Sequence, residues 1–112
     1  MDNWRINHLL ELLTQEPQDE FVMFALAHEY RKIEDYGHAI EYFQRLKLQN
    51  AEYVGLYFHL GHCYEGLNQF HDAQATYKAG ISIATQLNEE HALRELKGAL
   101  VNLEMEYPDQ FS

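Results

Sequence analysis

Aromatic and histidine side chains recur at helical spacing in two places in this chain. Phe24 and His28 are four residues apart, and so are Phe58 and His62. Residues four apart lie on one face of a helix. Aromatic rings beside polar groups are typical of peptide-binding surfaces, while imidazole nitrogens suit zinc, copper or nickel. The pattern therefore allows two kinds of chemistry, recognition of a partner segment and metal coordination.

Metal coordination would depend on His28, His59 and His62, three of the seven histidines. His59 and His62 are three residues apart and share a helix face. No cysteine or acidic residue joins them at a recognised ligand spacing, and a metal site also needs carboxylates that orient its histidines. We therefore expect solvated or hydrogen-bonded histidines, and neither a metal nor another cofactor.

Catalytic motifs do not accompany these residues. The sequence contains no GxSxG, HExxH or Cys-x-x-Cys, and its glycines occur singly, so it has no phosphate-binding loop. The only cysteine, Cys63, lies beside an apolar stripe and is expected to be buried rather than reactive. Because 18 acidic residues always offer some chance pairing, a metal-dependent or enzymatic role stays a third hypothesis. The expectation is that the protein is not an enzyme.

The two histidine-containing stretches are copies of one repeat with an offset of 34 residues. The identical pairs at this offset are Phe24 with Phe58, Leu26 with Leu60, His28 with His62, Tyr30 with Tyr64, and Ala39 with Ala73. Small residues also match small ones, as Ala27 matches Gly61, and aromatic residues match aromatic ones, as Phe43 matches Tyr77. A fixed period in this range predicts stacked helical units that share a core.

Residue size within the repeat predicts where helices cross. Ala27 and Gly61 are small where two helices must approach closely, and Ala39 and Ala73 are small on the partner helices. Large side chains against small ones allow a helix pair to reach native packing density. Gly80 stands where the first copy has a leucine, which we interpret as a departure at the edge of the motif.

The pattern resembles the tetratricopeptide repeat (TPR) family. The resemblance depends on two stretches, Leu60-Gly61-x-x-Tyr64 followed by Ala73-x-x-x-Tyr77, and Leu26-Ala27-x-x-Tyr30 followed by Ala39-x-x-x-Phe43. The chain departs from the family at Met23, where an aromatic residue is usual, and at Ala51 and Thr85, where proline is usual. The resemblance implies a small two-repeat protein of bacterial type. Its fold would be an all-α, right-handed solenoid of helical hairpins with about six antiparallel helices.

One domain is expected for residues 1–112. Its predicted parts are an N-terminal half-repeat or cap helix at 3–16, repeats at 20–53 and 54–87, and a C-terminal capping helix at 88–107. Helices are predicted at 3–15, 20–32, 36–48, 52–66 and 70–86, with Asn88 capping the last helix and the tail fraying after Pro108.

By resemblance to the family, the first helix of each hairpin lines a concave groove. The candidate partner-binding residues on that face are Phe24, His28, Arg31, Lys32, Phe58, His59, His62 and Glu65. Two rows of side chains would then lie side by side when the repeats stack. Packing of Phe24 and Phe58 on neighbouring helices is an equal alternative. Arg31 and Lys32 also suit the C-terminal end of a helix dipole without any partner.

Charge and hydropathy narrow the classes of partner. The formal charge of −10 argues against nucleic acid and anionic membranes, because both require a basic surface. The first residues, MDNWRINHLL, do not resemble a signal peptide, and no apolar run approaches the ~20 residues of a membrane span. A cytoplasmic protein is expected.

The leading hypothesis is a non-catalytic adaptor or scaffold that binds a peptide or partner segment in the concave groove. The alternative is a self-associating structural module, a homodimer in which another copy covers the apolar groove or cap surface. Short solenoids have much exposed edge relative to their core, which favours covering of that surface.

Overall fold

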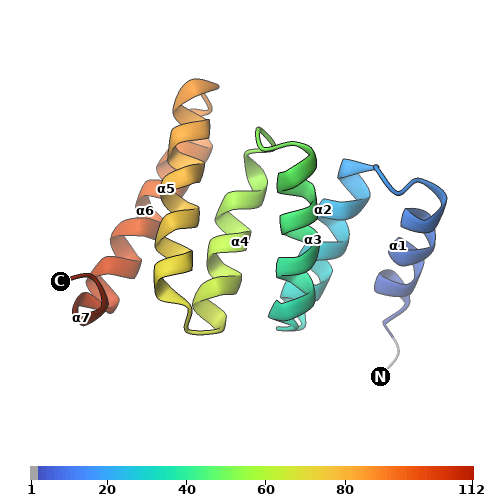
Figure 1. Cartoon of the computed structure of the whole chain (residues 1–112), viewed down its shortest axis with the longest axis horizontal. Helices are drawn as coiled ribbons and strands as arrows, with labels where there is room; N and C mark the ends of the chain where they lie inside the picture. The colour runs from blue at the N-terminus through green and yellow to red at the C-terminus, as the bar shows by residue number, and fades with distance from the viewer. Residues whose placement is uncertain (1–2) are drawn as a thin grey trace. The chain divides into compact units, whose positions relative to one another are not determined.

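The computed structural model describes residues 3–112, and its regular structure is helical throughout (Figure 1). The helices are α1 (Trp4–Gln15), α2 (Glu20–Lys32), α3 (Tyr36–Gln49), α4 (Gly55–Gly66), α5 (Phe70–Gln86), α6 (Glu90–Glu106) and α7 (Pro108–Phe111). The chain separates into two compact units, one ending at Tyr53 and one beginning at Val54. The expected all-α fold of helical hairpins is confirmed, and the short α7 adds to the six helices that the sequence predicts. The single-domain organisation stays a prediction.

The helices of the first unit begin at side-chain caps. Asp19 accepts a hydrogen bond from the Val22 N–H at 3.1 Å, and Asp35 accepts one from the His38 N–H at 3.3 Å. Asn3 caps α1 in the same way. These caps satisfy backbone donors that a helix leaves without a partner in its first turn, so each helix has a defined starting residue.

The core of the first unit lies between α2 and α3. Its fully buried side chains are Leu26, Ala27, Ala39, Phe43 and Leu46. Helix α1 packs against α2 and adds Ile6 and Leu13. The predicted alternation of small and aromatic residues is therefore present where the hairpin is tightest.

In the second unit, α5 contacts both α4 and α6, and two glycines allow the contacts. A Cβ on Gly61 would overlap the ring of Tyr77, with Cζ at 2.6 Å. A Cβ on Gly80 would lie 2.6 Å from the Cβ of Tyr57 and 3.0 Å from a methyl carbon of Leu96. Gly80 is therefore at a buried crossing of three helices, and the interpretation of it as an edge departure is wrong.

The predicted start of the fourth helix is also wrong. The sequence predicts a helix from Glu52, but α4 begins at Gly55. The side chain of Asn50 accepts a hydrogen bond from the Glu52 N–H, and the Tyr53 N–H donates to the Asn50 carbonyl. These bonds form a turn, which delays the helix and places the Tyr53 ring 5.3 Å from that of Phe24.

The C-terminal segment differs from the prediction in two ways. Asn88 does not cap α6; it takes a left-handed conformation with φ of 56° in the turn after α5, and Glu89 is the N-cap residue. Asparagine tolerates this conformation better than most residues. The tail beyond Pro108 forms α7, because the Tyr107 ring stacks on Phe70 and the Phe111 ring contacts α5.

The close crossing at Gly61 can be tested against an exposed glycine on another helix. We expect Gly61→Ala to destabilise the protein by about 2 kcal/mol, because the new methyl group enters the space of a buried aromatic ring. Gly98→Ala should instead stabilise it by about 0.5–1 kcal/mol, since no described atom lies within 4 Å of the new Cβ and alanine favours a helix. Urea denaturation followed by circular dichroism measures both changes. Equal effects of the two substitutions would contradict the proposed crossing.

Candidate functional site

The row of candidate residues on α2 is built around two stacked rings. The Phe24 and His28 rings are nearly parallel, with centroids 6.3 Å apart. Phe24 also meets Phe43 edge-on at 5.9 Å and Tyr53 at 5.3 Å. Phe24 and His28 are both half-buried, so each ring keeps part of its surface in solvent. Phe24 therefore packs against other rings of the first unit and also keeps part of its own ring on the surface.

The basic end of this row lowers the pKa of His28. Burial is the main cause, and the positive charges of Arg31 and Lys32 act in the same direction. The Arg31 guanidinium lies 3.4 Å from His28 Nδ1. Because the neutral imidazole has an acceptor nitrogen, it can accept a hydrogen bond from this guanidinium. The lowered pKa therefore favours the neutral form of His28 near neutral pH.

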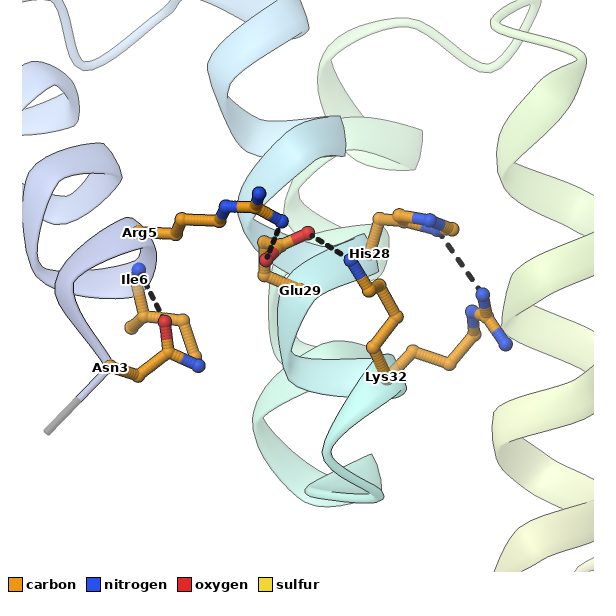
Figure 2. A network of polar contacts seen from close by, with 7 residues as sticks. Asn3, Arg5, Ile6, His28, Glu29 and Lys32 are labelled. Carbon is orange, nitrogen blue, oxygen red and sulfur yellow. Dashed lines mark hydrogen bonds and ion pairs between the residues drawn. The ribbon is translucent and has the colours of Figure 1, made fainter. Parts of the chain in front are cut away.

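Glu29 connects two basic residues of the first unit, Arg5 and Lys32 (Figure 2). Its carboxylate lies 3.1 Å from the Lys32 ammonium and 3.8 Å from the Arg5 guanidinium of α1. Part of the charge of Lys32 is thereby neutralised within the protein. Among the basic candidates, Arg31 keeps a buried Nε–H without a hydrogen-bond partner in residues 3–112.

The row on α4 groups a second set of rings. Phe58 lies 4.4 Å from His62 and 5.5 Å from His59, measured between ring centroids. The His62 ring meets Tyr77 of α5 edge-on at 6.1 Å. Phe58, His59 and His62 are all half-buried. The structure thus brings together the candidate rings of each row within its own unit.

Glu65 ends the second row in contact with the helix behind it. The Tyr77 hydroxyl donates a hydrogen bond to the Glu65 carboxylate. Burial, with this hydrogen bond as the next cause, raises the pKa of Tyr77 well above its usual value. The Glu65 carboxylate is therefore engaged inside the unit, which the spacing of its row did not predict.

Metal-binding clusters, the cysteine and membrane-spanning helices can each be checked in residues 3–112. This part of the chain contains no group of three or more histidine, cysteine or acidic residues that could hold a metal ion. Cys63 is fully buried, as expected. Among the described helices, none combines the length and apolar character needed to cross a membrane.

Comparison with known proteins identifies the family. The Tetratricopeptide repeat family model matches residues 22–52 and 54–87. This chain belongs to the tetratricopeptide repeat family. The comparison with curated proteins finds no match to this chain.

Solved structures agree with this TPR assignment. A tetratricopeptide repeat domain protein from Salinibacter ruber is 37% identical, with a TM-score of 0.73 over 80% of this chain and 90% of that one. The TPR2B domain of yeast Sti1, solved as a complex with pHsp70, is 15% identical, with a TM-score of 0.84 over 90% and 81% of the chains. PcrH, solved with the chaperone binding region of PopD, is 14% identical, with a TM-score of 0.84 over 90% and 77%.

Sequence reasoning missed three residues that shape these TPR rows, namely Glu29, Tyr53 and the Tyr77 hydroxyl. Glu29 carried a signal, because its separation of three residues from Lys32 is typical of a helical ion pair. The sequence contains no comparable signal for Tyr53 or Tyr77. The turn before α4 brings Tyr53 to Phe24, and the α4–α5 hairpin brings Tyr77 to Glu65, so both contacts depend on folding.

Removing the Tyr77 hydroxyl tests how firmly Glu65 is held. We expect Tyr77→Phe to lower the free energy of unfolding by about 1.5–3 kcal/mol, the usual range for a hydrogen bond to a charged group. Urea denaturation of the parent, Tyr77→Phe, Glu65→Ala and the double variant measures the coupling between the two side chains. Fully additive effects would show that the hydrogen bond contributes nothing to stability.

The lowered pKa of His28 predicts a pH dependence of stability. A folded-state pKa below 6.5 means that the folded protein binds this proton more weakly than the unfolded chain does. The part of the folding stability that depends on neutral His28 is fully present above pH 6.5. It is lost as the pH falls through the pKa of His28 in the folded protein. The parent should therefore lose more thermal stability than His28→Gln when the pH is lowered from about 7 to about 5. Parallel melting curves across this range would contradict the expectation.

Proposed function

We propose that this protein is a non-catalytic adaptor that binds a segment of a partner protein through the aromatic and histidine rows of α2 and α4. The single observation that best supports the proposal is the half-exposed ring pair in each repeat, Phe24 with His28 and Phe58 with His62. Each pair offers an apolar face and a polar edge, the combination enriched in peptide-binding surfaces.

Neighbouring aromatic side chains hold the rings of the two rows in place, and this supports binding of a partner rather than packing alone. Phe24 is supported from behind by Phe43 and Tyr53, and His62 by Tyr77. Rings held in this way lose little conformational freedom on binding, which favours affinity. A surface ring without such support would bind at a greater entropic cost.

Hydrogen-bonding capacity in the first row indicates what the partner should offer. A buried donor without an acceptor is costly, and Arg31 Nε–H is such a donor among the described residues. Because this Nε–H is covered by the protein itself, a carbonyl or carboxylate oxygen of a bound segment would reach it only if the Arg31 side chain turned outward. The second row ends in Glu65 rather than a basic residue, so the two repeats favour different parts of a partner.

Related folds make a peptide partner reasonable. The Sti1 domain and PcrH were solved in complexes with pHsp70 and with a region of PopD. Both share only the fold with this chain, so we take the mode of binding from them as an analogy and transfer no partner.

A capture experiment with paired variants tests the proposal. The parent, Phe24→Ala/His28→Ala and Phe58→Ala/His62→Ala would each be immobilised and exposed to lysate of the source organism. We expect a protein that the parent retains and each row variant loses, because truncation of supported aromatic residues removes most of the energy at such surfaces. A fragment of the captured protein should then bind the purified parent directly in calorimetry.

The matched control is Glu41→Ala/Lys78→Ala, which removes exposed side chains from the return helices α3 and α5. It should capture the same protein as the parent. Circular dichroism must show that each row variant is folded, and His28→Ala and His62→Ala alone replace any that is not. Capture of one identical set by all variants would refute the role of the rows.

A further inference from the structure

The outer faces of α1 and α6 are not used by the proposed binding rows, which lie on α2 and α4. On α1 the solvent-facing stripe consists of Trp4, His8, Glu11 and Gln15, with steps of four, three and four residues. Trp4 is the only tryptophan in the chain, and it is 68% exposed. An indole so exposed at the edge of a small protein is unusual for a purely structural residue.

A hollow lies beside this stripe. It has a volume of about 250 Å³ and is lined by Trp4, Arg5, His8 and Leu9 of α1 and by Ala25 and Glu29 of α2. Its charged lining residues are Arg5 and Glu29, which lie 3.8 Å apart, and Glu29 also pairs with Lys32 nearby (Figure 2). The hollow is therefore an apolar recess with room for one side chain, next to these charged groups.

A matching stripe lies on α6, on the side away from its buried residues. Arg94, Gly98, Val101 and Met105 also follow steps of four, three and four residues, and all are exposed. Met105 is 75% exposed and Val101 is 51% exposed. Glu106 follows Met105, and Lys97 lies beside Gly98. This stripe is apolar at its C-terminal end, and its N-terminal end carries Arg94 and Lys97 together with the exposed Glu90 and Glu95.

The two stripes are complementary when the helices run antiparallel. Met105 then falls opposite Trp4, Val101 opposite His8, and Gly98 opposite Glu11. Methionine sulfur makes favourable contacts with aromatic rings. Arg94 and Lys97 come within a turn of Glu11, while Glu106 comes near Arg5. In this register the apolar ends match, and Glu11 and Arg5 each face a side chain of opposite charge, which favours this register over others.

We propose that α6 of one copy docks on the α1–α2 face of a second copy, with Met105 in the hollow beside Trp4. The contact joins two different surfaces, so it is a head-to-tail interface that leaves one α1 face and one α6 face unused at the ends. This association does not use the aromatic and histidine rings of the proposed binding rows. The charge of −10 per chain opposes growth, so the expected products are dimers and short oligomers.

Arg5 determines how closely the docked helix approaches. It stands one repeat before Ala39, the small residue of the α2–α3 hairpin core. An arginine at this place prevents the close crossing that α2 and α3 achieve. Contact therefore depends on long side chains, and truncating Trp4 or Met105 should abolish it.

Sedimentation velocity of the full chain, with tryptophan fluorescence, tests the proposal. We expect the sedimentation coefficient of the parent to rise with concentration, and the emission of Trp4 to shift to shorter wavelength as the indole is buried. Trp4→Ala and Met105→Glu should each stay monomeric. Both residues are largely exposed, so both variants should melt like the parent. A parent that stays monomeric up to millimolar concentration would overturn the proposal.

Mixing the two variants distinguishes a head-to-tail interface from a symmetric one. Met105→Glu keeps an intact α1 face, and Trp4→Ala keeps an intact α6 face, so an equimolar mixture should form a dimer. Only the Met105→Glu copy contains tryptophan, so a blue shift in the mixture reports burial of its Trp4. Self-association of Met105→Glu alone would show a symmetric α1 contact and overturn the proposal, as would failure of the mixture to associate.

The matched control is Leu48→Glu, which places the same charge at a side chain that is 88% exposed on α3. It should associate like the parent. Loss of association in this variant as well would show that added negative charge alone prevents assembly, and the assignment to α1 and α6 would fail.

Discussion

The close approach of paired helices is the constraint on which the rest of this structure depends. Gly61 lets the Tyr77 ring enter the space that a Cβ would occupy, and Ala27 and Ala39 are fully buried in the other hairpin. Aromatic rings that fill such crossings are held from several sides. The same rings support the surface, since Phe43 lies behind Phe24 and Tyr77 lies behind His62. Stability and the candidate binding rows thus share their side chains.

Electrostatics within the units shape what each row offers a partner. In the first unit, Glu29 takes up part of the charge of Lys32, and burial together with the neighbouring cations lowers the pKa of His28. In the second, Tyr77 holds the Glu65 carboxylate. The rows are therefore less charged than their sequences indicate, and their rings contribute more of the accessible chemistry. This balance is consistent with the proposed binding of an apolar partner segment through a few hydrogen bonds.

The terminal helices α1 and α6 cover apolar faces of the helical hairpins. A helical hairpin stack exposes an apolar face at each end unless a cap covers it. Helices α1 and α6 bury their apolar stripes against α2 and α5, and the Tyr107 ring adds a stack on Phe70. Yet their outer faces keep Trp4 and Met105 in solvent. The terminal helices thus cover the core while their outer faces stay exposed.

The sequence by itself determined the helices and the repeat, because these depend on the spacing and size of residues within one segment. Asp19 and Asp35 begin their helices as local caps, and Gly61 was recognised as a close crossing from its size alone. The grouping of rings within each row also followed from helical spacing. Only the tertiary structure decided the partners of those residues. The turn at Tyr53, the role of Gly80 and the hydrogen bond to Glu65 depend on segments brought together by folding, and no single segment contains that information.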